Sequence, residues 1–227
     1  MLTLILAESS LEPVPSGIKG SNLTKNLVKK ERKGKSTILD VSLHSKIIQN
    51  LPNREKRGRP DIVHLSLLAA LGTPLNKYGF LQIFVHTIQD VVIKIAPETR
   101  LPKNYNRFIG LMEQLYTLGK VPPNRPPLLT LEKMSLENLI KNLNPSETLL
   151  FTEKGPILKL QPVMNELLKQ KNPVIIIGGF PHGDFSPETL NLSDKKISIS
   201  PETLDTWIVV SRVLYCYEEA LLNDKPR

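Results

Sequence analysis

The segment from Ile175 to Phe185, IIIGGFPHGDF, places two adjacent glycines at the end of an apolar run. Glycine has no Cβ atom, so Gly178 and Gly179 would allow the backbone to approach a bound ligand closely. A tight turn after a buried strand would explain the same pair. Taken alone, the two glycines therefore indicate either a ligand-binding loop or a structural turn.

The known phosphate-binding loops do not fit this segment. The chain has no G-x-x-x-x-G-K-S/T motif, and GGFPHG lacks the G-x-G-x-x-G spacing of a dinucleotide-binding turn. A ligand would instead be held by backbone groups and by apolar side chains such as Phe180, Ile197 and Ile199. This chemistry suits an adenosine-type cofactor.

Basic residues form three clusters along the sequence. Lysine and arginine total 30 against 22 acidic residues, which gives a formal net charge of +8 and an isoelectric point near 9.5. The clusters are Lys19–Lys35, Asn53–Arg59 and Arg100–Arg107. Such clusters suit phosphate groups, although each alone would also fit a solvated basic loop. Together they favour a polyanionic partner, with nucleic acid as the first candidate.

Cysteine and histidine give no indication of a metal site. Cys216 is the sole cysteine, which excludes an internal disulfide and offers no cysteine cluster for zinc. His44 and His86 are not grouped with acids or cysteine at metal-ligand spacing. No metal is therefore expected, and His182 in the glycine loop is given no role.

Membrane association is not expected either. The longest apolar runs, such as Leu65–Leu71, are too short to cross a bilayer. The opening residues MLTLILAESS have no basic leader, which argues against a signal peptide. A cytoplasmic location is the simplest expectation.

Alternating strands and helices predict an α/β fold with a mostly parallel sheet and helices on both faces. Strands are expected at residues 1–7, 38–43, 128–133, 147–155, 173–180 and 195–200, with a hairpin at 80–97. Helices are expected at residues 44–51, 59–72, 104–119, 135–143, 160–170 and 200–222. We expect a single domain over residues 1–227, with a basic mobile excursion at about residues 13–36 and a hairpin-containing extension at about 73–100.

Two of these helices carry side chains of interest. The helix at 59–72 has proline at its first position and Asp61 in its first turn, where an acid would stabilise the helix N-terminus. His64 lies one turn further on, and we expect it to be buried and hydrogen-bonded. The helix at 104–119 has an apolar stripe that is expected to face the core, formed by Phe108, Leu111, Met112, Leu115 and Leu118.

In an open parallel sheet, ligands bind beyond the carboxyl ends of the strands. The segments Thr152–Gly155, Gly178–Gly183 and Ser198–Glu202 each follow a predicted strand. Since the carboxyl ends of parallel strands lie at one edge, these three loops are expected to meet there and to form the ligand site.

Four segments occur in an order that resembles a known family: GRPDIVHLSLLAAL, RLPKNYNRFIGLMEQL, IIIGGFPHGDF and KKISISPETLDTWIVVSRVLYCYEEAL. They resemble the archaeal form of the pseudouridine-N1-specific small-subunit ribosomal RNA methyltransferases, which belong to the SPOUT, or α/β-knot, superfamily. The resemblance covers nearly the whole chain. GRPDIVH and the closing ISIS-P-x-x-L block are its specific parts, whereas the double glycine alone is not.

The resemblance implies a trefoil knot near the C-terminus, in which three loops pack around S-adenosylmethionine. It also implies a homodimer that serves ribosome assembly, with small-subunit ribosomal RNA as substrate and assembly proteins as further partners. The last predicted helix supports a dimer, because its apolar residues surround much of its circumference. These residues are Trp207, Ile208, Val209, Leu214, Tyr215 and Leu221.

By the same resemblance, the cofactor-binding positions lie in the three loops and directly after the last one. They are Phe151, Thr152, Gly178, Gly179, Gly183, Ile197, Ser198, Ile199, Ser200, Pro201, Glu202 and Leu204. Of these, Leu204 would line the adenine pocket or begin the core of the last helix. Side chains at Gly178 and Gly179 would crowd the knot.

The resemblance also implies that Arg59 contacts the substrate RNA and that Asp61 holds this arginine. The residues Arg100, Lys103 and Arg107 match further RNA-binding positions. The implied reaction moves a methyl group from the sulfonium to N1 of pseudouridine, which must lose a proton. Asp61 would orient Arg59 or accept this proton.

Two other functions remain open at this point. One is a non-catalytic RNA-binding assembly factor that keeps the fold. The other is a SPOUT methyltransferase that acts on another RNA position, such as a ribose 2′-hydroxyl.

Overall fold

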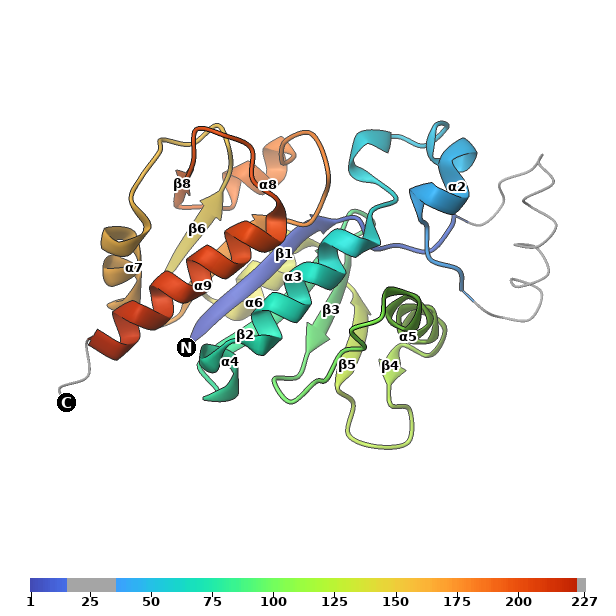
Figure 1. Cartoon of the computed structure of the whole chain (residues 1–227), viewed down its shortest axis with the longest axis horizontal. Helices are drawn as coiled ribbons and strands as arrows, with labels where there is room; N and C mark the ends of the chain where they lie inside the picture. Colours follow the sequence, from blue (N-terminus) through green and yellow to red (C-terminus); the bar gives the residue numbers. More distant parts are fainter. Residues whose placement is uncertain (16–35, 224–227) are drawn as a thin grey trace.

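Residues 1–15 and 36–223 are described by the computed structural model, in which one sheet of eight strands runs in the order β4-β5-β3-β2-β1-β7-β6-β8 (Figure 1). The strands are β1 (Leu2–Ser9), β2 (Leu81–Thr87), β3 (Val91–Ile95), β4 (Lys120–Val121), β5 (Leu129–Lys133), β6 (Glu147–Phe151), β7 (Pro173–Gly178) and β8 (Lys195–Ile197). The helices are α2 (Val41–Ile48), η1 (Arg54–Lys56), α3 (Pro60–Gly72), α4 (Pro74–Lys77), α5 (Tyr105–Leu118), α6 (Leu136–Leu143), α7 (Leu160–Leu168), α8 (Pro187–Asn191) and α9 (Thr206–Asn223). The basic cluster Lys19–Lys35 and most of the predicted excursion lie outside the described residues.

The sheet has a parallel half and an antiparallel half. Strands β2, β1, β7, β6 and β8 are parallel to one another, as the alternation of strands and helices predicted. The predicted hairpin is confirmed, because β2 and β3 pair antiparallel. β5 pairs antiparallel with β3 and carries β4 beyond it, so the strand predicted at 128–133 extends the hairpin.

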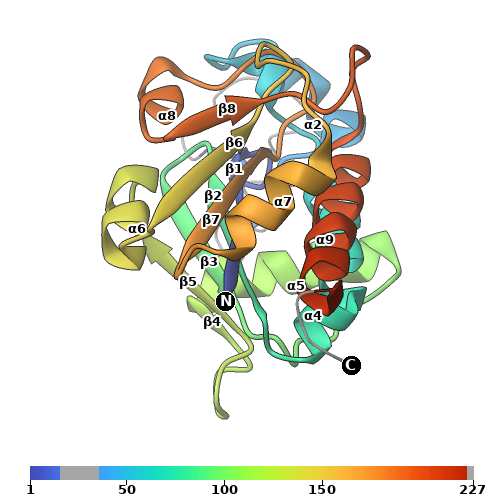
Figure 2. The same ribbon diagram turned by 90° about the vertical axis from the view of Figure 1, so that its left-hand side faces the viewer.

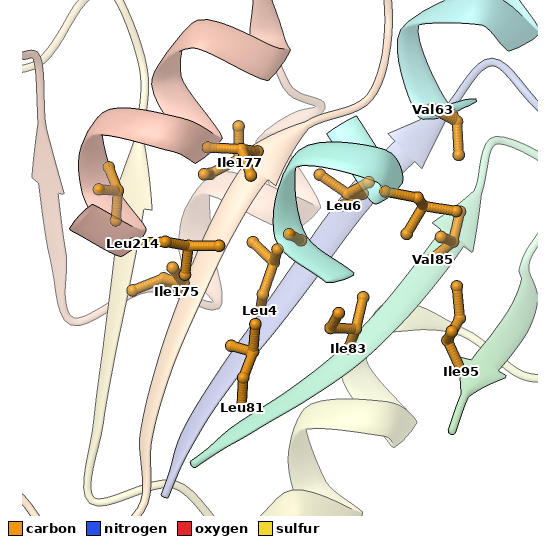
Figure 3. Close-up of a cluster of buried hydrophobic side chains, with 14 of the residues drawn as sticks. Leu4, Leu6, Val63, Leu81, Ile83, Val85, Ile95, Ile175, Ile177 and Leu214 are labelled. Carbon is orange, nitrogen blue, oxygen red and sulfur yellow. The ribbon is translucent and has the colours of Figure 1, made fainter. Parts of the chain in front are cut away.

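Helices cover both faces of the sheet. Side chains alternate between the faces of a strand, and along β1 Leu4 and Leu6 point to one face while Ile5 and Ala7 point to the other. On the first face they pack with residues of α3 and α9 such as Val63 and Leu214 (Figure 3). The second face is covered by α6 and α8 (Figure 2). This double burial explains why most residues of β1 and β7 are apolar.

The two helices that were predicted from capping signals are confirmed. α3 begins at Pro60 with Asp61 in its first turn, and α6 is capped by Ser135, whose Oγ accepts a hydrogen bond of 3.3 Å from the backbone N–H of Asn138. His64 is buried as expected. Its Nε2 lies 2.7 Å from the Pro102 carbonyl oxygen, and its ring stacks on Phe108 with 4.3 Å between centroids.

Three expectations about local structure were wrong. Residues 38–43 do not form a strand, because Asp40 caps α2 by accepting from the Ser42 N–H and the helix therefore begins at Val41. The last helix begins at Thr206 instead of residue 200, since residues 198–205 form a loop. Leu118 at the end of α5 is 48% exposed, whereas Phe108, Met112 and Leu115 are buried. None of the described helices is long and apolar enough to span a membrane.

Candidate functional site

A cavity of about 490 Å³ lies beyond the carboxyl ends of β6, β7 and β8. The three loops that follow these strands form its walls, and the first turn of α9 and Arg59 complete it. The expectation that the loops meet at one edge of the sheet is therefore confirmed. The described residues contain no cluster of histidine, cysteine and acidic side chains able to hold a metal ion.

Most of the predicted cofactor-binding positions line this cavity. They are Phe151, Thr152, Gly178, Gly183, Ile197, Ser198, Ile199, Ser200, Glu202 and Leu204. Gly179 and Pro201 do not line it. Phe180, predicted as an apolar wall, contributes its ring, which lies edge-on to that of Phe185 with 5.3 Å between centroids.

The first and third loops are joined backbone to backbone. Thr152 N–H donates to the Ile197 carbonyl oxygen at 2.9 Å, and Ser198 N–H donates to the Pro156 oxygen at 2.9 Å. A Cβ atom at Gly155 would lie 2.6 Å from the carbonyl carbon of Ile197, so the two backbones approach each other so closely that only glycine fits. Gly155 was not singled out from the sequence, although it ends the TEKG turn.

Gly178 and Gly179 are each required to be glycine for a different structural reason. A Cβ at Gly178 would lie 2.8 Å from the Phe180 ring, which is itself a wall of the cavity. A Cβ at Gly179 would lie 2.1 Å from Oγ of Ser9, at the end of β1. Gly178 therefore keeps the cavity open, whereas Gly179 allows the loop to pack against the neighbouring strand.

Asp184 is a site residue that sequence reasoning missed. It lines the cavity, accepts a hydrogen bond of 3.1 Å from Oγ1 of Thr152, and pairs with Lys154 at 3.0 Å. Burial acts against its charge, but the bonds from Lys154, from its neighbour's N–H and from Thr152 hold the pKa of Asp184 below its ordinary value. The ionised carboxylate thus ties the second loop to the first. The only available signal was the acid in GGFPHGD.

Arg59 and Asp61 form one unit at the cavity. Nε of Arg59 donates to Oδ1 of Asp61 at 2.9 Å, and its second terminal nitrogen donates to Oδ2 at 2.8 Å. Both side chains are somewhat more than a third exposed, at 38% and 35%. The hydrogen bonds that Arg59 donates to Asp61 raise the pKa of Arg59, so the guanidinium stays charged. Arg59 lines the cavity, whereas Asp61 does not.

Other ionisable groups surround this pair. Asp205 lines the cavity, and its charge, like that of Asp40, helps to raise the pKa of Arg59. The Tyr105 hydroxyl donates to Asp40, which joins the start of α5 to the start of α2. Burial and the Asp40 carboxylate both raise the pKa of Tyr105 well above its usual range, so it remains a donor.

The second basic cluster, Asn53–Arg59, does not present its charges freely to phosphates. Lys56 pairs with Glu8 at 2.5 Å, and Arg57 pairs with Glu12 at 2.7 Å. Arg59 is held by Asp61. Three of the four cations of this segment are thus held by acids, whereas Arg54 is exposed and has no ion pair among the described residues. The interpretation as an open phosphate-binding cluster therefore holds only in part.

The predicted RNA-binding residues Arg100, Lys103 and Arg107 lie away from the cavity lining, before and within the first turn of α5. All three are exposed. Among the described residues none of them forms an ion pair. The bond between His64 and the Pro102 oxygen fastens this segment to α3, the helix that begins next to Arg59. This contact links the third basic cluster to the helix that follows Arg59.

Residues 4–218 match the EMG1/NEP1 methyltransferase family. The ribosomal RNA small subunit methyltransferase Nep1 of Staphylothermus marinus is 46% identical over 215 residues, which cover 94% of this chain and 93% of that protein. The protein of the same name from Thermococcus kodakarensis is 44% identical over 222 residues, with coverage of 97% and 99%. A crystal structure of Archaeoglobus fulgidus Nep1 bound to S-adenosylhomocysteine matches with a TM-score of 0.82 at 36% identity, and the match covers 97% of this chain and 98% of that one.

Proposed function

Because the chain belongs to the EMG1/NEP1 methyltransferase family, we propose that it transfers a methyl group from S-adenosylmethionine to N1 of a pseudouridine in small-subunit ribosomal RNA. The family and the fold class expected from the sequence are confirmed. The chain is a methyltransferase that uses S-adenosylmethionine and acts on small-subunit ribosomal RNA. The base and the atom that receive the methyl group are the proposed part.

The cavity fits the cofactor by its size and chemistry. Its volume of about 490 Å³ lies within the range of pockets for ligands of this size. Phe180, Ile199 and Leu204 offer apolar contact for an adenine ring, and the backbone at Gly178 is open to close approach. When bound, the cofactor supplies the electrophilic methyl group.

The observation that carries the proposal is the position of Arg59, which lines the cavity while Asp61 holds it by two hydrogen bonds. Pseudouridine has an N1–H group that uridine lacks. Loss of that proton leaves negative charge on the ring and its carbonyl oxygens. A preorganised guanidinium next to the base stabilises this charge, and Arg59 retains N–H donors that Asp61 does not occupy.

The geometry supports one of the two roles that the sequence left open for Asp61. Both of its carboxylate oxygens accept hydrogen bonds from Arg59, which favours an orienting role over proton abstraction. Asp205 is better placed as the proton acceptor, because it is exposed and lines the cavity near Arg59. No described residue donates a hydrogen bond to its carboxylate. Asp205 is thus the proposed base and Asp61 the proposed positioning residue.

The RNA would extend from the cavity over the start of α5. Arg100, Lys103 and Arg107 are exposed cations there and would meet phosphates. The target base must leave its stack to reach the cofactor, and phosphate contacts hold the strand while it does so. A cytoplasmic location and contacts with assembly proteins are predictions that accompany this role.

A second copy of the chain would cover the exposed apolar residues of α9. Ile208, Tyr215 and Leu222 are 37%, 60% and 55% exposed and follow each other at intervals of seven residues, so they lie on one face of α9. This apolar stripe supports the homodimer expected from the resemblance. Leu214, which the sequence placed with these residues, is instead fully buried in the core.

Methyl transfer to matched RNA oligonucleotides tests the proposed function. One oligonucleotide carries pseudouridine at a single position, the other carries uridine there, and the methyl group of S-adenosylmethionine is radiolabelled. Label is expected in the pseudouridine RNA alone, and nucleoside mass spectrometry should locate it on the base. Label in both RNAs would indicate another position such as a ribose hydroxyl. Tight binding without label in either would support the non-catalytic alternative.

A further inference from the structure

A buried ion pair joins the end of β1 to the second basic cluster. Nζ of Lys56 lies 2.5 Å from Oε2 of Glu8, and the two side chains are 10% and 9% exposed. The other carboxylate oxygen of Glu8 accepts a hydrogen bond of 2.8 Å from the backbone N–H of Ser186. Burial opposes ionisation of Glu8, but the bonds from Lys56 and Ser186 hold its pKa below the ordinary value. Neither group is exposed enough to bind RNA.

The same lysine contacts the loop that forms the second wall of the cavity. Its Nζ lies 4.6 Å from the centroid of the Phe180 ring, within the range of a cation–π interaction. The backbone at Gly183 passes close by, because a Cβ there would lie 3.6 Å from Cε of Lys56. Phe180 and Gly183 both line the cavity. With the Ser186 bond to Glu8, the pair therefore supports residues 180–186 along most of their length.

On its other side, the pair supports the segment that carries the arginine. Lys56 lies in η1, three residues before Arg59. The backbone N–H of Arg59 donates to Oγ of Ser10 at 2.7 Å, and Ser10 lies two residues after Glu8. The loop that faces the cofactor and the segment that faces the base thus rest on the same end of β1.

We propose that Lys56 is a positioning residue, whose pair with Glu8 holds loop 180–186 at a set position relative to Arg59. This inference rests on the proposed function, because it concerns how the cofactor and the base meet. Removal of the Lys56 charge releases Phe180 and leaves Glu8 without its partner. Both the affinity for S-adenosylmethionine and the methyl-transfer rate then fall.

The adjacent ion pair offers a matched control. Arg57 and Glu12 are 2.7 Å apart, and their side chains are 10% and 1% exposed. The second partner of Glu12 is Gln89, at 2.6 Å, and none of these three residues lines the cavity. Arg57 is thus as buried as Lys56 and stands next to it in the chain, but it supports no part of the cofactor loop.

The experiment compares Lys56→Met with Arg57→Met in the full chain. Thermal unfolding reports the loss of each buried pair, and calorimetric titration with S-adenosylmethionine reports the cofactor site. Both variants should unfold at lower temperature, but only Lys56→Met should weaken cofactor binding, by tenfold or more. The double variant Glu8→Gln with Lys56→Met removes the unpaired carboxylate. It should recover part of the lost stability and keep the weak cofactor binding.

Equal cofactor affinities in Lys56→Met and Arg57→Met would overturn the inference, as would full recovery of affinity in the double variant. Single-turnover methyl transfer at saturating cofactor adds a second readout, and Lys56→Met is expected to be at least tenfold slower than Arg57→Met. A wild-type chain that fails to methylate pseudouridine RNA contradicts the proposed function. A wild-type chain that methylates it, with Lys56→Met as active as Arg57→Met, contradicts the inference alone.

Discussion

The pair formed by Arg59 and Asp61 gives the sharpest prediction, because we expect it to contribute little to the free energy of unfolding and much to the rate of methyl transfer. Its two hydrogen bonds of 2.8 and 2.9 Å are well formed, but both side chains are more than a third exposed. A pair of this exposure contributes about 0.2–1 kcal/mol to folding. A preorganised donor at a developing negative charge contributes ~2.7–4 kcal/mol to the transition state, or a factor of about 10²–10³ in rate.

The perturbations are Arg59→Ala, Asp61→Ala and the double variant. Each single change should slow methyl transfer by roughly 10²-fold or more while the unfolding free energy falls by about 1 kcal/mol or less. The double variant should be little slower than either single variant, because residues that act as one unit lose their effect together. The rate is measured in single turnovers on pseudouridine RNA at saturating cofactor, and calorimetry confirms that the cofactor still binds.

Substitution by asparagine separates orientation from proton transfer. Asp61→Asn keeps one oxygen that can accept from Arg59, so much of the activity should survive. Asp205→Asn keeps the size of the side chain but cannot accept the proton, so the rate should fall by about 10²-fold, within the range for a lost general base. Additive losses in the Arg59 and Asp61 double variant, or full activity in Asp61→Ala, would refute the paired role. A fully active Asp205→Asn would remove Asp205 from the mechanism.

Four further predictions concern the loops, the RNA surface and the dimer. Gly178→Val should abolish binding of S-adenosylmethionine in calorimetry, because the valine side chain displaces the Phe180 ring into the cavity. Gly155→Ala should lower the free energy of unfolding by about 1–3 kcal/mol, because the Ile197 backbone cannot move aside. Arg107→Glu should weaken RNA binding in filter titrations, leave cofactor affinity unchanged and reduce the slope of log affinity against log salt by about 0.7. Tyr215→Glu should convert a dimer into a monomer in sedimentation velocity at micromolar concentration, and a wild-type monomer there would contradict the proposed interface.

The sequence predicted the fold well where local pattern and final environment agree. The apolar runs of β1 and β7 become strands buried on both faces, and the proline and serine signals begin α3 and α6. One error falls at residues that form part of the site. Residues 198–205 contain helix-compatible residues, yet Thr206 donates to the Gly178 oxygen and the preceding loop closes the cavity. Local propensity could not show that this segment is needed elsewhere.

Charge patterns were informative only in part, for a physical reason. A cluster of cations indicates a phosphate site only if its charges remain free, and pairing partners can come from any distance along the chain. Lys56 and Arg57 pair with acids of β1 and its extension, 48 and 45 residues earlier. By contrast, Arg100 and Arg107 are exposed. The sequence predicted such exposed cations in all three clusters.

The end of β1 supports both the loop 180–186 and Arg59, the proposed catalytic residue. The last residues of β1 and the residue after them contact both parts of the site. Glu8 accepts hydrogen bonds from the Ser186 N–H and from Lys56. Ser10 accepts a hydrogen bond from the Arg59 N–H. Between them, Ser9 occupies the space that a side chain at Gly179 would need. Gly179 is therefore required by the close packing against β1, and Gly178 by the space that the ligand needs. A strand at the centre of the sheet, buried on both faces, is the part of this fold least free to move. A methyl group and its acceptor must meet within tenths of an ångström, so both are best fastened to such a strand.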